Sequence, residues 1–455
     1  MAAELSAQAH TIVALASASG IAGVAVVRLS GSEAVAIASA LCASTNMPHG
    51  QMQLRRLREP LTNAPIDTGY VVYFGAPRSY TGEDVIEFHV HGSPAGVDRL
   101  IAACCAGGAR IADRGEFTQR ALGNGKLDLA QAEGLLDVLH AQAEHQHRAA
   151  LAHLDGRLSR AIDLLRQPLL RVTAEIEARI DFAAEPHLAQ FDRGPIRSLL
   201  LDIAERTQAL AATAQAGRVR LRGARVVLAG APNAGKSTLL NALVGHDRAI
   251  VDPRPGTTRD TLEVATAPEG VLVTWIDTAG LRLATDSVEV QGTARALGEV
   301  LHADLVLWII DQGALPSALP ATPAPVVRVR NKSDGPEHPN VRTDPQWQQS
   351  LAVCALNGDN IDELRRLVVA LVRSLGSIGQ GAKVAIARQR HADGLQRAEQ
   401  AVRAALAQLD PLAELALELV AADLRDAIFA LDELTGPMTP DDVLAAIFSE
   451  FCIGK

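Results

Sequence analysis

The sequence predicts a chain of mixed class, in which an α/β N-terminal domain precedes a discontinuous helical domain that a second α/β domain interrupts. Short apolar runs separated by Gly and Pro fill residues 1–118, and apolar residues spaced by three or four dominate 119–217 and 377–455. Strands and helices alternate over 218–376, which is typical of a parallel sheet. A length of 455 residues suits about three such domains.

The N-terminal segment is expected to hold four strands and a short helix. Runs of β-branched and apolar residues predict strands at 11–16, 24–29, 70–73 and 85–91. The apolar spacing at 32–41 predicts a helix, and Gly and Pro mark the turns between these elements.

The helical pattern begins at Leu127 and carries an apolar stripe that Pro168 interrupts, so we expect a kink there. The pattern breaks at 184–195, resumes at 196–215, and returns from about residue 384 to residue 455. The simplest arrangement is one helical domain with the α/β segment inserted into it, provided that the two ends of the insert are neighbours.

Composition limits the class of protein. A net charge of -9 argues against broad binding of nucleic acid through phosphate contacts, although a local basic patch is allowed. No apolar run reaches about 18 residues, and no basic start precedes an apolar core, so we expect a cytoplasmic protein without a membrane anchor. The cysteines show neither metal-ligand spacing nor a disulfide framework, and we expect reduced thiols: Cys42, Cys104, Cys105, Cys354 and Cys452.

A phosphate-binding loop is predicted near the start of the inserted segment. An apolar strand at 225–228 is followed by G-A-P-N-A-G-K-S at 230–237 and by a helix at 238–244. This is the G-x-x-x-x-G-K-S pattern in the strand, loop and helix context that it requires. Backbone N–H groups and the helix N-terminus would face phosphate, Lys236 would reach the β and γ phosphates, and Ser237 would ligate Mg²⁺.

The N-K-S-D motif at 331–334 indicates guanine as the base. It follows an expected strand at 325–330, the next-to-last strand of the segment. The carboxylate of Asp334 can only accept hydrogen bonds, and guanine presents two donors on one edge where adenine presents none in that arrangement. Asn331 would tie the loops together, and Lys332 would lie along the base.

Two further motifs occur in the expected order. D-T-A-G at 277–280 follows an expected strand at 271–276, so that Asp277 would hold a Mg²⁺-bound water and a glycine N–H would face the γ-phosphate. G-T-T-R-D at 256–260 lies between a helix and a strand, as a first switch loop does, and Thr258 would be the second hydroxyl ligand of Mg²⁺. Four ordered motifs predict a Ras-like P-loop domain that binds and hydrolyses GTP.

The group that handles the attacking water stays open at this point. Ras-type proteins place a glutamine after the D-x-x-G motif, and Leu281 occupies that position here. Asn233 could coordinate a monovalent cation beside the phosphates, and Asp286 or Glu289 could activate water. The alternative is a slow switch that needs a partner protein, and the chemistry alone weights the two equally.

The motifs resemble, from end to end, those of the bacterial tRNA-modification GTPases of the MnmE (TrmE) family, which belong to the TrmE-Era-EngA-like P-loop GTPases. The GTPase motifs are widely shared. More specific matches are N-G-K-L-D-L-A-Q-A-E at 124–133 and the final F-C-I-G-K at 451–455. T-G-E-D at 81–84 and R-G-E-F-T at 114–118 add to them.

The resemblance implies three parts: an N-terminal domain that dimerises and binds (6S)-5-formyl- or 5,10-methylene-tetrahydrofolate, a helical domain, and a G domain that dimerises in the presence of K⁺. It also implies a homodimer that joins a flavoprotein partner, MnmG, in a heterotetramer, with FAD only in the partner. The complex would bind certain tRNAs and add an aminomethyl or carboxymethylaminomethyl group to C5 of the wobble uridine.

A rival hypothesis is a ribosome-assembly or regulatory GTPase that acts as an RNA-binding switch. That class predicts a basic, lysine-rich module after the G domain. The C-terminal block is instead helical in pattern and poor in lysine, and it ends in the C-I-G-K motif. The first hypothesis is therefore favoured.

The resemblance also assigns site residues position by position. Glu289 would activate water with Lys236 and Asn233 beside it, and Ser237 and Thr258 would hold Mg²⁺. The K⁺ ligands would be Asn233, Thr257 and the backbone of Asp252 and Arg254. The nucleotide contacts form one set: Asn233, Ala234, Gly235, Lys236, Ser237, Thr238, Asp252, Pro253, Arg254, Pro255, Gly256, Thr257, Thr258, Asp277, Thr278, Ala279, Gly280, Asn331, Lys332, Asp334, Cys354, Ala355 and Leu356.

The same resemblance assigns folate contacts to Arg28, Glu87, Lys126 and Lys455, and aligns Cys452 with a cysteine suspected of a functional role. Folates carry carboxylates, which arginine and lysine bind well. Without the resemblance, Arg28 would be as well explained by an exposed strand end and Glu87 by the outward face of a strand.

Three stretches depart from the family pattern. Residues 19–23, Ser-Gly-Ile-Ala-Gly, replace the family's glycine- and arginine-rich turn, which bears on the folate site. Residues 354–356, Cys-Ala-Leu, replace a guanine motif such as Ser-Ala-Lys, and still place a backbone N–H near the base. Asp252 and Arg254 are unusual in a K⁺ loop, so K⁺ stimulation is expected to persist but to be weaker.

Overall fold

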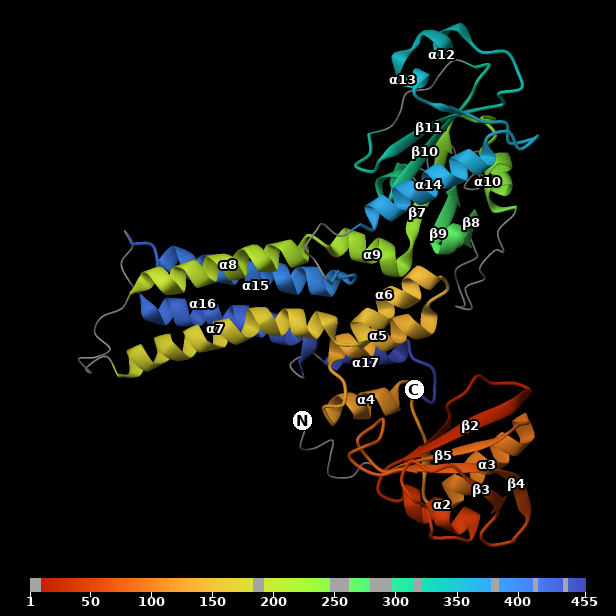
Figure 1. The fold of residues 1–455 in the computed structure, drawn as a ribbon, viewed down its shortest axis with the longest axis vertical. Helices are drawn as coiled ribbons and strands as arrows, with labels where there is room; N and C mark the ends of the chain where they lie inside the picture. Colours follow the sequence, from red (N-terminus) through yellow and green to blue (C-terminus); the bar gives the residue numbers. More distant parts are fainter. Residues whose placement is uncertain are drawn as a thin grey trace, which may run out of the picture. The chain divides into compact units, whose positions relative to one another are not determined.

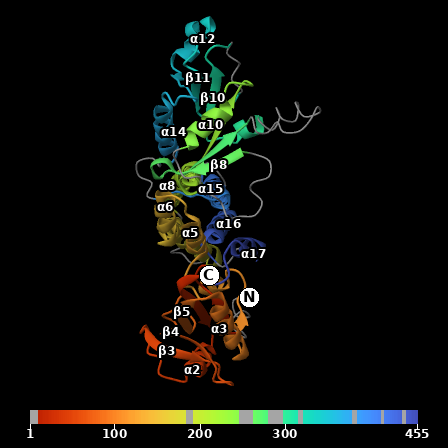
Figure 2. The same cartoon turned by 90° about the vertical axis from the view of Figure 1, so that its right-hand side faces the viewer.

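The computed structural model describes residues 10–182, 192–245, 262–278, 297–314, 321–377, 384–411, 416–436 and 441–455. The chain forms two compact units (Figures 1 and 2). Unit 1 consists of 1–136, 154–166 and 428–455, and unit 2 consists of 137–153 and 167–427. The mixed α/β and helical class predicted from the sequence is confirmed, whereas the bounds of the four predicted segments stay a prediction.

Unit 1 contains a six-stranded sheet in the order β3-β4-β5-β2-β1-β6. Neighbouring strands are antiparallel except β1 and β6. Val27 and Phe88 are cross-strand partners and are fully buried in the core that α2 and α3 help to form. The elements are β1 (Ile12–Leu15), β2 (Ala22–Ser30), α2 (Ala34–Cys42), β3 (Gln53–Arg58), β4 (Pro65–Phe74), β5 (Val85–Gly92), α3 (Pro94–Ala106) and β6 (Arg110–Ile111).

The rest of unit 1 is helical. α4 (Glu116–Gly123) follows β6, and α5 (Leu129–His140) begins in this unit. α17 (Asp441–Ser449) returns from the far end of the chain and buries Phe448 against Leu129 in a small apolar core.

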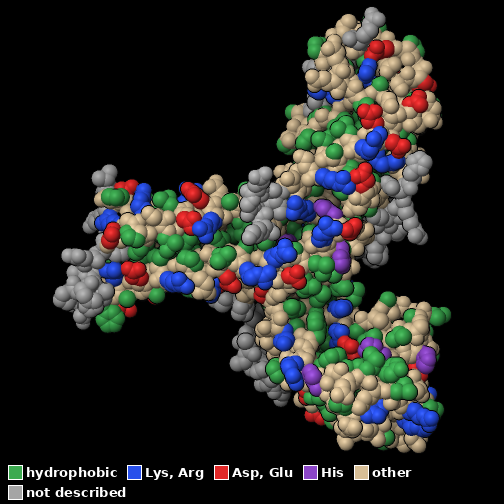
Figure 3. Space-filling model, in the orientation of Figure 1, with side chains coloured by type: hydrophobic (Ala, Val, Ile, Leu, Met, Phe, Trp, Pro, Cys, Tyr) green, Lys and Arg blue, Asp and Glu red, His purple; other side chains and the backbone are tan. Residues whose placement is uncertain are grey.

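Unit 2 contains a helical part in which segments distant in sequence lie side by side. α8 packs along α15, and an ion pair from Arg425 to Glu177 at 2.7 Å joins α16 to α7 (Figure 1). Figure 3 shows hydrophobic side chains gathered along α8 and α15, with charges of both signs at their edges. The helices are α6 (Glu144–Leu154), α7 (Arg157–Asp181), α8 (Arg193–Ala211), α9 (Ala214–Arg222), α15 (Gln389–Gln408) and α16 (Leu417–Thr435). Residues 154, 157–166 and 428–435 of these helices belong to unit 1.

α7 runs through Pro168 as one helix of 25 residues, so the proline does not end it. The expected kink at Pro168 stays a prediction. α8 begins where the side chain of Asp192 accepts a hydrogen bond from the Gly194 N–H at 2.9 Å, which is an N-cap for the helix.

The second sheet, in unit 2, has the order β12-β11-β10-β7-β9-β8 and is parallel except for β8. Leu239 of α10 and Val368 of α14 are buried against one face, and Trp308 and Trp347 belong to the core on the other. The elements are β7 (Ala224–Gly230), α10 (Lys236–Val244), β8 (Leu262–Thr266), β9 (Val273–Asp277), β10 (Leu305–Asp311), β11 (Val326–Asn331), α12 (Pro339–Thr343), α13 (Pro345–Gln348), β12 (Leu351–Ala352) and α14 (Ile361–Leu375).

The two ends of this α/β segment are neighbours. The Arg220 side chain donates to the carbonyl oxygen of Gly376, and the Ile386 N–H donates to Thr213 Oγ1 at 3.1 Å. A Cβ atom added at Gly217 would lie 1.9 Å from the Ile386 oxygen, so the two chain passages touch. This is the geometry that an inserted domain requires. In the described part of the chain, no helix is long and apolar enough to cross a lipid bilayer.

Candidate functional sites

The loop between β7 and α10, predicted to bind phosphate, is built on two glycines. Gly230 and Gly235 have φ values of 149° and 86°, which side-chain-bearing residues rarely adopt. A Cβ at Gly230 would lie 2.0 Å from the Ile309 oxygen, and one at Gly235 would lie 2.3 Å from Asn331 Nδ2. The sequence therefore folds here only because both positions lack a side chain.

The ammonium group of Lys236 lies inside this loop. Its Nζ donates to the carbonyl oxygens of Gly230 at 3.0 Å and Ala231 at 2.8 Å, and the residue is buried. The two carbonyl oxygens hold the Lys236 ammonium close to the N–H groups of the loop and to the N-terminus of α10. Loops of this kind bind phosphate at that place.

Ser237 and Asp277 meet at the same end of the sheet. Ser237 Oγ donates to Asp277 Oδ2 at 2.5 Å, and Asp277 is fully buried at the end of β9. The neighbouring Thr278 donates from Oγ1 to the Leu228 carbonyl at 2.9 Å, which fixes the end of β9 against β7. A hydroxyl and a carboxylate at this position fit a hard cation such as Mg²⁺.

Asn331 ties three loops together. Its Nδ2 donates to the Ala234 oxygen in the phosphate loop at 2.9 Å, and its Oδ1 accepts from the Ala355 N–H at 3.1 Å. The side chain is buried. Asn331 thus fixes the phosphate loop and the predicted base-contacting loops relative to one another.

Asp334 is positioned by an unexpected donor. Cys354 Sγ donates to Asp334 Oδ1 at 3.2 Å, and Cys354 is buried. A serine hydroxyl at this place would be a stronger donor than a thiol. The following Leu356 is 80% exposed, so it contributes no side-chain packing to the loop.

Asp311, the last residue of β10, was not predicted from the sequence as a site residue. Asp311 is in register with Asn331, and its Oδ2 accepts from Lys332 Nζ at 2.6 Å. Burial raises the pKa of Asp311, but hydrogen bonds from Lys332 and from the Gly313 N–H hold it below its usual range. The available signal was an acidic residue at the carboxyl end of a buried parallel strand.

Some predicted site residues lie outside the described part of the chain, and their roles stay predictions. They are Asp252, Pro253, Arg254, Pro255, Gly256, Thr257, Thr258, Ala279, Gly280, Leu281, Asp286 and Glu289.

A second candidate site lies on the sheet of unit 1. Arg28 and Glu87 are cross-strand partners on β2 and β5, and Arg28 Nε and Nη2 lie 2.9 and 2.8 Å from Glu87 Oε1. The guanidinium carbon is 5.2 Å from the ring centroid of Tyr80 and 5.7 Å from that of Phe117. Within the described residues, the buried Arg28 Nη1 has no hydrogen-bond partner. Arg28, with a side chain 13% exposed, is therefore a largely buried, oriented cation rather than an exposed strand end.

The end of the chain packs against this site. Ile453 forms an antiparallel bridge with Arg114, and a Cβ at Gly454 would lie 2.1 Å from the Leu15 oxygen. Lys455 is half-buried. Burial, and then repulsion from Arg28, lowers its pKa, while Glu87 and Cys452 act in the opposite direction.

The structure thus brings Arg28, Glu87 and Lys455 together. Lys126 lies apart from this contact set. Its Nζ donates to the Pro77 oxygen at 2.9 Å, on the same loop as Tyr80. Cys452 is exposed. Arg28 Nη1 and a lysine ammonium only donate hydrogen bonds, so the site fits a ligand with carboxylate or other acceptor oxygens.

A glycine-built phosphate loop, a serine bonded to a buried aspartate, and an N-K-S-D loop tied to it by Asn331 define a guanine-nucleotide-binding P-loop protein. Two family profiles refine this class. "GTP-binding protein TrmE N-terminus" matches residues 11–126, and "MnmE helical domain" matches residues 129–452. The chain belongs to the MnmE (TrmE) family of tRNA modification GTPases, as its motifs predict.

Curated relatives agree with this assignment. A tRNA modification GTPase MnmE of Thermus thermophilus is 40% identical over 450 residues, which cover 98% of this chain and 99% of the relative. The tRNA modification GTPase MnmE of Xanthomonas campestris pv. campestris is 42% identical over 462 residues, which cover 99% of this chain and 100% of the relative. The solved G domain of the T. maritima FeoB iron transporter is 24% identical over 32% of this chain and 98% of that domain, with a TM-score of 0.23. The assignment rests on the profiles and the full-length relatives.

Proposed function

We propose that this chain is a K⁺-stimulated GTPase that works as a homodimer with the flavoprotein MnmG and modifies C5 of the wobble uridine of certain tRNAs, using a tetrahydrofolate one-carbon unit. GTP hydrolysis itself follows from membership of the MnmE family. The observation that carries the nucleotide part is the double hydrogen bond of Asn331, which couples the phosphate loop to the loop that contacts the base.

The chemistry of hydrolysis is assigned to groups at the phosphate loop. Lys236 would exchange the two carbonyl oxygens for β and γ phosphate oxygens and so offset charge that develops on them. Ser237, with Thr258, would hold Mg²⁺, which neutralises phosphate charge when bound. Asp277 already lies against Ser237 and would orient a water on the metal.

The K⁺ part of the proposal rests on Asn233. This residue is exposed in the phosphate loop with a φ of 63°, so a side-chain oxygen is available at the edge of the phosphate site. Thr257 and the carbonyls of Asp252 and Arg254 would complete the K⁺ shell, and Glu289 would activate water. An added positive charge near the transferred phosphoryl group would substitute for an arginine finger.

The test is steady-state GTP hydrolysis in KCl and in NaCl at equal ionic strength, with Asn340→Ala, at an exposed asparagine of α12, as a control. We expect fast turnover only in KCl, retained by Asn340→Ala and lost by Asn233→Ala and Glu289→Ala. Equal, slow turnover in both salts would contradict a K⁺ site and would favour activation by a partner protein.

The folate part rests on the unpartnered Nη1 of Arg28, because a buried guanidinium nitrogen is stable only when it finds an acceptor. Titration calorimetry with 5-formyltetrahydrofolate should show saturable binding that Arg28→Met abolishes. The exposed Arg99, on α3 of the same unit, supplies the matched control Arg99→Met, which should bind as the parent does. Absence of binding by the parent protein would remove folate from the proposal.

A further inference from the structure

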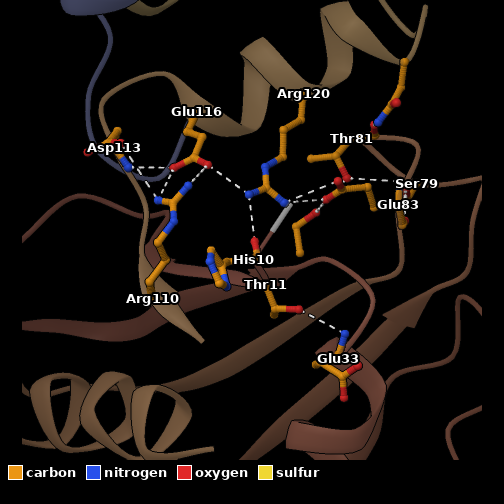
Figure 4. Close-up of polar contacts among 12 residues, drawn as sticks. His10, Thr11, Glu33, Ser79, Thr81, Glu83, Arg110, Asp113, Glu116 and Arg120 are labelled. Atoms are coloured by element: carbon orange, nitrogen blue, oxygen red, sulfur yellow. Dashed lines mark hydrogen bonds and ion pairs between the residues drawn. The ribbon is translucent and has the colours of Figure 1, made fainter. Parts of the chain in front are cut away.

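Four charged side chains of unit 1 form a continuous ion network (Figure 4). Arg120 lies between two carboxylates: its Nη1 is 3.0 Å from Glu83 Oε2, and its Nη2 is 2.9 Å from Glu116 Oε1. Arg110 continues the network outward: its Nη1 lies 2.8 Å from Glu116 Oε2 and 3.8 Å from Oδ2 of the exposed Asp113, which lies beyond these four. The Arg120 and Glu116 side chains are each 10% exposed, whereas that of Arg110 is 43% exposed. Arg120 is the buried centre and Arg110 the outer arm.

The network joins a loop to a helix. Glu83 belongs to the loop at 79–84, and Arg120 and Glu116 belong to α4. The loop is also tied to β2, because Ser30 Oγ donates to Glu83 Oε2 at 2.7 Å. Ser30 Oγ further lies 2.8 Å from Thr81 Oγ1. Glu83 is therefore the residue at which the loop meets both β2 and α4.

The same loop and the same helix supply the two rings at Arg28. Tyr80 lies in the loop, and Phe117 follows Glu116 on α4. The Tyr80 hydroxyl lies 2.7 Å from Thr118 Oγ1, so ring and helix touch directly as well. A displacement of the loop from α4 would move one ring relative to the other and loosen the ring contacts of the Arg28 guanidinium, which Glu87 alone would then hold.

We infer that the Glu83–Arg120 ion pair is a positioning device for Arg28. By fixing the loop that carries Tyr80 against the helix that carries Phe117, it holds Arg28 Nη1 in place for an acceptor group of the ligand. Glu83 and Arg120 act through Arg28 and are not assigned a ligand contact. The inference rests on the proposal that Arg28 binds tetrahydrofolate.

The test compares three variants of the full chain by titration calorimetry with 5-formyltetrahydrofolate. Glu83→Gln keeps the shape of the side chain and removes its charge, and Arg120→Met removes the central cation. Each should raise Kd about tenfold, because the ring contacts of Arg28 are loosened. Arg110→Met cuts the outer arm of the network and should bind within about twofold of the parent.

A double-variant cycle separates positioning from general damage. If Glu83 and Arg120 act as one unit, Glu83→Gln combined with Arg120→Met should raise Kd no further than either change alone. Glu83→Asp, which keeps the carboxylate, should recover part of the affinity. Near-ultraviolet circular dichroism of the three tyrosines, all within residues 70–80, should change in the two central variants without ligand.

The outcomes are distinguishable. No binding by the parent chain would overturn the folate proposal. If the parent chain binds 5-formyltetrahydrofolate and the Glu83→Gln and Arg120→Met variants bind it with the same Kd, only the positioning role is overturned. An equal loss in Arg110→Met, or additive losses in the double variant, would also overturn it, because the whole network rather than the central pair would then be at work.

Discussion

At the scale of single residues, the contact from Cys354 to Asp334 has a measurable consequence. The thiol is a weaker hydrogen-bond donor than a hydroxyl, so Asp334 is held less firmly than a serine would hold it. We predict that Cys354→Ser lowers the Kd for GDP and Cys354→Ala raises it, each by a few-fold, corresponding to about 1 kcal/mol. Fluorescent GDP titration measures both, with Cys105→Ser as a control thiol in unit 1. Equal affinities in the serine and alanine variants would contradict the role of the thiol.

Single residues also show which parts of the nucleotide site could be predicted from the sequence. Lys236, Ser237 and Asn331 were predictable because their motifs fix both neighbours and order along the chain. Asp311 was not, because its partner Lys332 is reached only through the register of two parallel strands. Likewise, the ion pair of Arg28 with Glu87 joins residues that are 59 positions apart, and residue type alone does not reveal it.

At the scale of elements, α4 depends on a charge in its first turn. Burial raises the pKa of Glu116, but Arg110, the Asp113 N–H and Arg120 together hold it below its usual value of 4.5. Because the folded-state pKa is lowered, the stabilisation is fully present above pH 4.5 and is lost as pH falls through the folded pKa.

We therefore predict that Glu116→Gln destabilises unit 1 by about 2 kcal/mol at pH 7 and that its difference from the parent shrinks as pH falls below about 4.5. Urea unfolding followed by tyrosine emission measures this, since all three tyrosines belong to unit 1 and the three tryptophans to unit 2. A difference that stays constant down to acidic pH would contradict the assignment of the charge.

The C-terminal tail makes a second element-scale prediction. Gly454 has a φ of 98° and no room for a Cβ, whereas Gly108 has a φ of 108° and nothing within 4 Å. Gly108→Ala should cost only the backbone strain, about 1 kcal/mol. Gly454→Ala should cost more, lift the tail from Leu15 and weaken binding of 5-formyltetrahydrofolate through Lys455. Calorimetric melting and ligand titration compare the two, and equal effects would show that packing of the tail is unimportant.

The pattern of strands and helices was predictable only where the apolar periodicity is plain. The four predicted N-terminal strands are present, but β3, α3 and the two-residue β6 were missed. β3, at the sheet edge, reads Q-L-R-R-L-R and does not alternate, and α3 opens on Pro94 and contains a small-residue run, so neither shows a clear period. Tertiary packing, rather than local pattern, decides both.

At the scale of the whole molecule, the two candidate ligands address different units. Mg²⁺-GDP at about 100 times its Kd should stabilise unit 2, which contains the phosphate loop, by about 2.7 kcal/mol. Hydrogen exchange read by mass spectrometry should then show slower exchange in β7, β10 and β11, and 5-formyltetrahydrofolate should slow exchange in β2 and β5. If either ligand protects both sheets equally, the units unfold as one, contrary to this prediction.

The inserted segment also sets the timing of synthesis. α8 leaves the ribosome before the whole nucleotide-binding segment, and its partner α15 follows only afterwards. At roughly 5–20 residues per second, the interval is on the order of 10 s. During that time Ile196, Leu200 and Ile203, which are buried in the finished helix, have no α15 to cover them. A chaperone that shields apolar helices would therefore bind α8 mainly in that interval. The nucleotide-binding segment is synthesised and folds during the same time.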